Sequence, residues 1–153
     1  MQSILQGLLQ DRGAIATIQH YLNLLEQGFL LSCINRFSGS PFQVKKSPPK
    51  IIIHDNGLLR AFHRPVSAPL QPDLLGRYFE NLVGARMIQA GWDVYYWTQR
   101  NHEVDFIVIT PDNEHLAIEV KSNTTTVEEL SGLKYFIKEN PEFKPVTPGK
   151  HDI

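Results

Sequence analysis

Three charged residues have a type and spacing that could do chemistry: Asp105, and Glu119 and Lys121 two positions apart. They lie in two apolar stretches, residues 103–110 and 115–122, which predict two strands joined by a proline-containing turn. Neighbouring carboxylates repel each other, and a hard divalent cation such as Mg²⁺ or Mn²⁺ can hold both ionised. A nearby lysine could orient an attacking water or stabilise charge on a phosphate. The alternative is a solvated cluster in which Lys121 neutralises one carboxylate.

The alternation of side chains along a strand predicts where these groups meet. In an antiparallel pair, a loop of three or five residues brings Asp105 level with Glu119 or Lys121. We therefore expect two carboxylates and an ammonium on one side of the hairpin. The face shared with Asp105 is expected to carry Ile107 and Ile109, and the opposite face Val104, Phe106 and Val108.

A helix over residues 73–90 is the clearest element of the chain, with Asp73 as its N-cap and Gly91 as its stop. Glu80 falls at the edge of its apolar stripe and could lean over the sheet as a third carboxylate, or pair with Arg77 in solvent. The stripe is expected to consist of Leu75, Tyr78, Phe79, Leu82, Val83 and Arg86.

The remaining elements of the C-terminal half of the chain follow in order. Residues 92–98 are aromatic and β-branched and predict a strand. After the central hairpin, Thr126 and Glu129 form a capping box for a helix that reaches Glu139, and residues 143–147 predict a weak final strand. The expected fold class is α/β: a small mixed sheet with one helix on each side. The last helix should bury Leu130, Leu133, Phe136 and Ile137.

The N-terminal part has the outline of a small winged-helix-like segment. Residues 1–10 and 17–27 predict two helices, and residues 29–34 and 51–53 predict two strands joined by a long basic arm. A short helical turn is expected near residues 57–62.

Three lysines of this arm, Lys45, Lys46 and Lys50, are candidate contacts to a nucleic-acid backbone. The alternative is a solvated loop beside prolines. That alternative, with a protein-contact or structural role, is favoured because the helix over residues 17–27 carries no Lys or Arg.

The domain organisation is expected to be a winged-helix-like segment at 1–62, a linker at 63–72 and a core domain at 73–153. The linker holds closely spaced prolines, which discourage a continuous helix.

Composition narrows the class of protein. The chain has 153 residues, 42% of them hydrophobic, with a net charge of −1 and one cysteine, Cys33. A single cysteine excludes an internal disulfide framework and fits a reducing compartment. No run approaches the roughly 20 apolar residues of a membrane span, so we expect a cytoplasmic protein. The six histidines show no HxxxH spacing, which argues against a zinc site.

The order of these elements and charges resembles the core of the PD-(D/E)xK superfamily, which includes restriction endonucleases. More closely, three stretches resemble the C-terminal domain of unknown function attached to a group of prokaryotic AAA-type ATPases. The stretches are TIQHYLNLLEQGFLL (17–31), KIIIHDNGLLRAF (50–62) and GRYFENLVGARMIQAGWDVYYWTQRNHEVDFIVITPDNEHLAIEVKS (76–122).

The resemblance implies a restriction-endonuclease-like fold, Mg²⁺ or Mn²⁺ as the cofactor, and DNA as partner and substrate. Asp105 and Glu119 would be metal ligands with a contribution from Glu80, and Lys121 the catalytic lysine. Val104 stands where the superfamily has its name-giving proline. The competing hypothesis is a non-catalytic module that binds nucleic acid or a protein partner.

The resemblance also implies an upstream ATPase, whose phosphate-binding motif G-x-x-x-x-G-K-[ST] does not occur in this sequence. We therefore expect a C-terminal piece of such a protein, with the core domain truncated at its own C-terminus.

Overall fold

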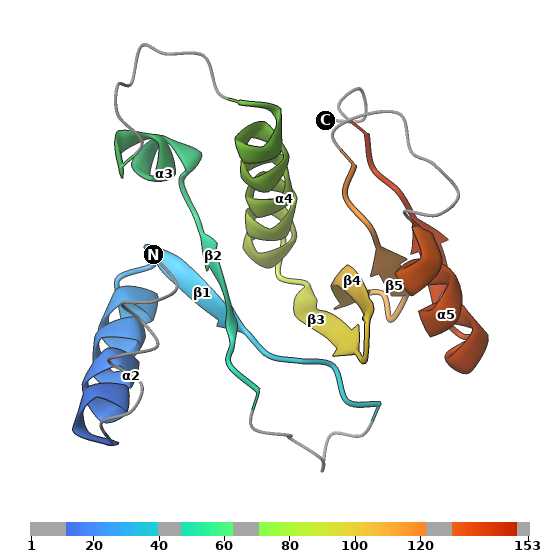
Figure 1. The fold of residues 1–153 in the computed structure, drawn as a ribbon, viewed down its shortest axis with the longest axis horizontal. Coiled ribbons are helices and arrows are strands. Elements are labelled where there is room, and N and C mark those ends of the chain that lie inside the picture. The colour runs from blue at the N-terminus through green and yellow to red at the C-terminus, as the bar shows by residue number, and fades with distance from the viewer. Residues whose placement is uncertain (1–11, 40–46, 63–70, 122–129, 150–153) are drawn as a thin grey trace.

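The computed structural model describes residues 12–39, 47–62, 71–121 and 130–149, which form a mixed α/β arrangement of four helices and two sheets (Figure 1). The larger sheet has four strands in the order β3-β4-β5-β6. Neighbouring strands are antiparallel except for β5 and β6, which are parallel, so the sheet is mixed as expected. Its strands are β3 (Asp93–Gln99), β4 (His102–Ile109), β5 (His115–Ile118) and β6 (Lys144–Val146).

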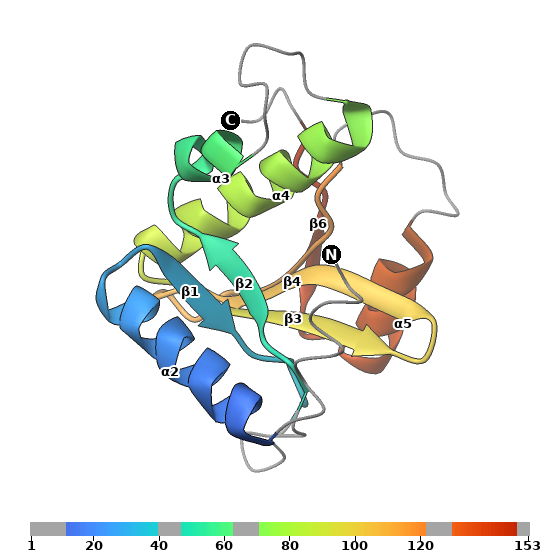
Figure 2. The same cartoon turned by 60° about the vertical axis from the view of Figure 1, so that its left-hand side comes forward.

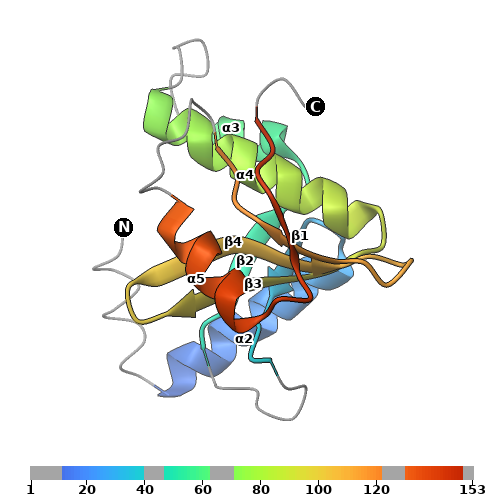
Figure 3. The same ribbon diagram turned by 90° about the vertical axis from the view of Figure 1, so that its right-hand side faces the viewer.

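One helix covers each face of this sheet (Figure 3). Helix α4 (Pro72–Gln89) packs on one face, where Val83, Ala85 and Met87 belong to the same apolar cluster as Phe106 of β4. Helix α5 (Ser131–Glu139) packs on the other through Leu133 and Phe136. This confirms the expected layering, and both residues were expected on the buried side of α5.

The N-terminal elements are α2 (Arg12–Gln27), β1 (Leu31–Ile34), β2 (Lys50–Ile53) and α3 (Asn56–Phe62). Strands β1 and β2 form a separate antiparallel pair with α2 beside β1 (Figure 2). The hairpin and the helical turn agree with expectation. Helix α2 ends at Gln27 as expected but begins at Arg12, five residues before the expected start at residue 17. The helix expected at residues 1–10, the lysines at 45 and 46, and the Thr126/Glu129 capping box lie outside the described residues.

The hairpin is built into the core of the larger sheet. Ile34 and Ile52 are buried in the same apolar cluster as the α4-facing side chains of the sheet. After β1 the chain pairs with the edge of β3: the amide of Phe37 donates to the carbonyl of Tyr96 at 2.7 Å, and the amide of Tyr96 donates to the carbonyl of Asn35 at 3.1 Å. Apolar packing thus joins residues that precede the expected linker, 63–72, to residues that follow it.

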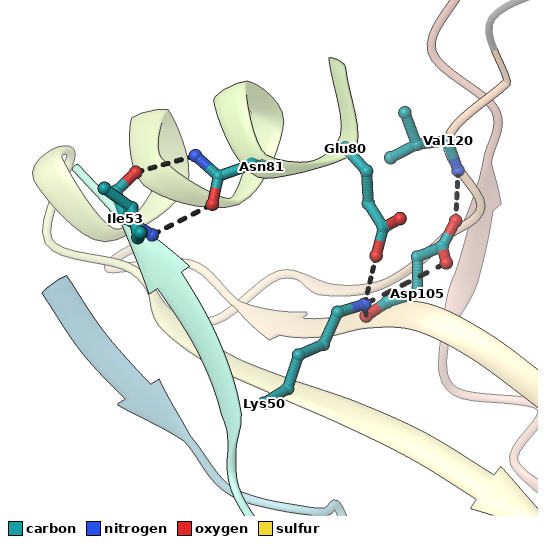
Figure 4. Close-up of polar contacts among 6 residues, drawn as sticks. All are labelled: Lys50, Ile53, Glu80, Asn81, Asp105 and Val120. Atoms are coloured by element: carbon teal, nitrogen blue, oxygen red, sulfur yellow. Dashed lines mark hydrogen bonds and ion pairs between the residues drawn. The ribbon is translucent and has the colours of Figure 1, made fainter. Parts of the chain in front are cut away.

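Helix α4 differs from the expected stripe. Leu75 and Arg86 are exposed, whereas Asn81 is buried and only 9% exposed. The Asn81 amide accepts a hydrogen bond from the backbone N–H of Ile53 at 2.9 Å and donates one to its carbonyl at 2.7 Å (Figure 4). It therefore supplies the hydrogen-bond partners that Ile53 lacks at the free edge of β2. Tyr78 and Val83 of the expected stripe are buried, so the expectation was wrong only in part. It missed Asn81 because α4 packs on a strand edge as well as a sheet face, and a strand edge requires a polar partner.

The start of α4 also differs. Gln71 is the N-cap and makes no side-chain capping bond, while Pro72 occupies the first turn. Proline is favoured there because its fixed φ suits a helix and its missing N–H would be unpaired anyway. Asp73 therefore lies within the first turn, where its charge interacts favourably with the helix dipole.

A β-bulge in β4 overturns the expected alternation. Tyr95 pairs with Ile107 but Trp97 pairs with Val104, so both Asp105 and Phe106 lie across from Tyr96. Val104 and Ile107 consequently lie together in the α5-side cluster, whereas Phe106 lies in the α4-side cluster. The expected grouping of Asp105 with Ile107, and of Val104 with Phe106, was therefore wrong.

Candidate functional site

The bulge turns the carboxylate of Asp105 toward α4 and the N-terminal hairpin. Its side chain is 20% exposed, and its Oδ2 accepts a hydrogen bond from the backbone N–H of Val120 at 2.8 Å. The β4–β5 loop has five residues, and the pairing of Phe106 with Ile118, continued by one step, sets Asp105 level with Glu119. Of the two expected registers, the one with Glu119 is therefore found, although the side chain of Asp105 is turned away from the face it was expected to share with Ile107.

Glu80 faces Asp105 across the ammonium group of Lys50 (Figure 4). The Lys50 Nζ forms an ion pair with Glu80 Oε1, lies 4.0 Å from Asp105 Oδ1, and donates to the carbonyl oxygen of Asp105 at 3.3 Å. Glu80 therefore leans over the sheet, which was one of its two expected positions. A helix, a strand and the hairpin each contribute one charged group to this cluster.

The pKa of Asp105 is raised to about 7, first by burial and then by the negative charges of Glu80 and Glu119. Lys50 and the Val120 N–H lower the pKa of Asp105, but by less than burial and the two carboxylates raise it. A carboxyl group with such a pKa is poorly solvated and surrounded by like charge. Perturbed carboxylates of this kind concentrate at functional sites.

Glu119 and Lys121 form the second half of the cluster. Glu119 is buried, and its Oε1 lies 3.0 Å from Lys121 Nζ. Burial raises the pKa of Glu119, while Lys121 and the backbone N–H of Asp105 lower it. Glu119 Oε2 is buried and finds no hydrogen-bond partner among the described residues. That oxygen is an acceptor with unused capacity.

A cavity of about 430 Å³ opens beside the cluster. Its walls come from residues 48–50 of the hairpin arm, Glu80 of α4, and residues 96–98 and 103–105 of β3 and β4. The cavity thus exposes Lys50, Glu80 and Asp105 to a ligand, while Glu119 and Lys121 lie outside its wall.

The structure brings together residues to which the sequence assigned different roles, as metal ligands or as nucleic-acid contacts. Glu80 and Asp105 are joined through the ammonium group of Lys50, Glu119 is close enough to act on Asp105 electrostatically, and Lys121 pairs with Glu119. Lys50, assigned from sequence to a basic arm, lies among the carboxylates. The signal that could have found it is its position immediately before an apolar strand, which places it in the packed hairpin instead of the polar arm.

The carboxylates suit a hard divalent cation by their chemistry. Glu80 and Asp105 hold carboxylate oxygens around one ammonium group, and one oxygen of the nearby Glu119 has no hydrogen-bond partner among the described residues. Burial, together with the charges of Glu80 and Glu119, raises the pKa of Asp105. Within the described residues no three acidic, histidine or cysteine side chains form a ready-made metal cluster. The positive charge between Glu80 and Asp105 is that of Lys50.

None of the helices in the described part of the chain is both long and apolar enough to span a bilayer. No curated protein matches the chain, and no solved structure matches it. A family model described as a domain of unknown function (DUF4143) matches residues 75–150, a range that contains most of α4, the four-stranded sheet and α5. The carboxylate cluster, apart from Lys50, lies inside that range. Residues 75–150 are therefore a DUF4143 domain, a domain of unknown function.

Proposed function

We propose that this domain hydrolyses DNA phosphodiester bonds with the help of Mg²⁺ or Mn²⁺. The observation that carries the proposal is the environment of Asp105, a buried carboxyl whose pKa is raised to about 7 between Glu80 and Glu119. Structural carboxylates are ordinarily paired so that ionisation is favoured, whereas this group is held where ionisation is costly. The restriction-endonuclease-like resemblance supports the same reading.

Each residue has a role in this proposal. Asp105 and Glu119, with Glu80, would hold the cation through carboxylate oxygens. The bound cation would polarise the phosphate and lower the pKa of a water molecule. Lys121 is placed by its 3.0 Å ion pair with Glu119 and would orient the attacking water or stabilise charge on the phosphate. The adjacent cavity, which has Tyr96 and Trp97 in its wall, would receive the nucleic acid.

A second function is favoured by one specific observation. Lys50 already neutralises Glu80 and Asp105 without a metal, which is the arrangement of a scaffold that needs no cation. On this alternative the domain is a non-catalytic module that binds nucleic acid or a protein partner. The resemblance to ATPase-linked domains makes an AAA-type ATPase of the cytoplasm the proposed partner in either case.

Cleavage of supercoiled plasmid tests the first function. We expect nicking in Mg²⁺ or Mn²⁺ that EDTA abolishes, and a loss of about 100-fold or more in Asp105→Ala and Lys121→Ala. Lys144→Ala is the matched control, because Lys144 also forms a 3.0 Å ion pair, with Glu114, on an exposed surface away from the cluster. Circular dichroism checks that each variant is folded.

Two outcomes would contradict hydrolysis: no cation-dependent cutting, or equal cutting by Lys121→Ala and the unmodified protein. The binding-module alternative is tested with a fluorescent duplex. It predicts that Asp105→Ala and Lys121→Ala retain the dissociation constant of the unmodified protein while no cutting occurs.

A further inference from the structure

Lys50 enters the acidic cluster from outside the DUF4143 domain. It begins strand β2 and extends toward α4 and β4 (Figure 4). Its ammonium contacts the carboxylate of Glu80, the carboxylate and the carbonyl oxygen of Asp105, and the ring of Phe106, whose centroid is 4.7 Å away. The side chain is 29% exposed.

The groups around this ammonium form a cation-binding set. Two carboxylates from different elements and one backbone carbonyl are the donor types that a hard divalent cation uses. A lysine ammonium is a compact point charge on a flexible stem, so it can satisfy the same oxygens.

We propose that Lys50 acts as an internal cation that competes with a divalent metal for Glu80 and Asp105. Metal binding then requires Lys50 to withdraw from the cluster. The inference rests on the proposed function, because it concerns the metal site assumed there. It assigns the N-terminal hairpin a role in controlling that site.

The surroundings of Lys50 allow withdrawal. Lys50 lines the 430 Å³ cavity together with Pro48 and Pro49, so its ammonium has adjacent space to enter. The backbone of the hairpin need not move, because Ile52 stays anchored in the core. By contrast, a purely structural ion pair would remain in place when metal is added.

The first test measures Mn²⁺ binding by isothermal titration calorimetry with four full-length proteins: unmodified, Lys50→Met, Lys50→Arg and Lys144→Met. We expect Lys50→Met to bind Mn²⁺ at least about tenfold more tightly, because a positive charge next to the site is removed. Lys50→Arg and Lys144→Met should bind like the unmodified protein, since the first keeps the charge and the second removes a charge elsewhere.

The outcomes separate this inference from the proposed function. Mn²⁺ binding of equal strength in Lys50→Met and the unmodified protein overturns the competition and leaves metal-dependent hydrolysis standing. Absence of Mn²⁺ binding in all four proteins overturns both.

The second test needs no variant and decides the matter should Lys50→Met fail to fold. Lysines of the unmodified protein are acetylated for short times with and without saturating Mn²⁺, and each site is quantified by mass spectrometry. We expect acetylation of Lys50 to accelerate several-fold in Mn²⁺ while that of Lys144 stays constant. An unchanged ratio of the two sites under saturating Mn²⁺ overturns the proposal.

Discussion

Asp105→Asn should stabilise the protein, and increasingly so as the pH rises. In the folded state the pKa of Asp105 is raised from its ordinary value of 3.8 to about 7, mainly by burial and by Glu80 and Glu119. The protonated form is therefore favoured by folding, and its contribution to stability is complete below pH 3.8 and lost as the pH rises through 7. One pKa unit corresponds to about 1.4 kcal/mol, so the full loss is about 4 kcal/mol. Asparagine has the shape of aspartic acid and can still accept from the Val120 N–H.

The measurement is the free energy of unfolding in urea at pH 5 and pH 8, in EDTA, for the unmodified protein and Asp105→Asn. The stability difference in favour of the variant should grow by about 2.5 kcal/mol between these two pH values, which is the part of the titration that falls between them. Asp112→Asn, in the exposed β4–β5 turn, controls for the loss of one carboxylate. A stability difference that is the same at both pH values would refute the reasoning about Asp105.

Two further substitutions test how the site is held. Gly132→Ala should lower the free energy of unfolding by about 1–3 kcal/mol in urea titrations, because an added Cβ would lie 2.1 Å from the carbonyl oxygen of Glu103 and force α5 away from β4; an unchanged midpoint would contradict this close approach. Asn81→Ala should cost about 2–4 kcal/mol, since it leaves the N–H and carbonyl of Ile53 without their partner. The thermal unfolding midpoint of Asn81→Ala is compared with that of Arg86→Ala, a substitution at an exposed position of the same helix. A loss no larger than in this control would argue against the role of Asn81.

The secondary structure was predictable to a large extent because it depends on local patterns. The apolar periodicity of residues 73–90, ended by Gly91, predicts α4 to within a residue. The aromatic and β-branched residues of 92–98 predict β3 in the same way. The face that α4 buries was less predictable, because Asn81 is polar and becomes a core residue only through the edge of β2.

The candidate site was predictable in its members but not in its arrangement. Asp105, Glu119 and Lys121 stand out by type and spacing, and Glu80 by its position at the edge of a stripe. Strict alternation, however, assigned Asp105 to the α5 side of the sheet with Ile107, whereas the bulge opposite Tyr96 directs it to the α4 side. A bulge depends on pairing between two strands, and no periodicity within one strand reveals it.

By itself the sequence determined the order of the helices and strands and the mixed α/β class, and it limited the residue level with Asp105 to Glu119 or Lys121. These properties follow from turn lengths and from neighbours along the chain. Only the tertiary structure decided that Asp105 faces Glu80 and that Lys50 lies between them. These contacts join residues 25 to 55 positions apart, and their geometry exists only after the hairpin, α4 and the sheet have packed together.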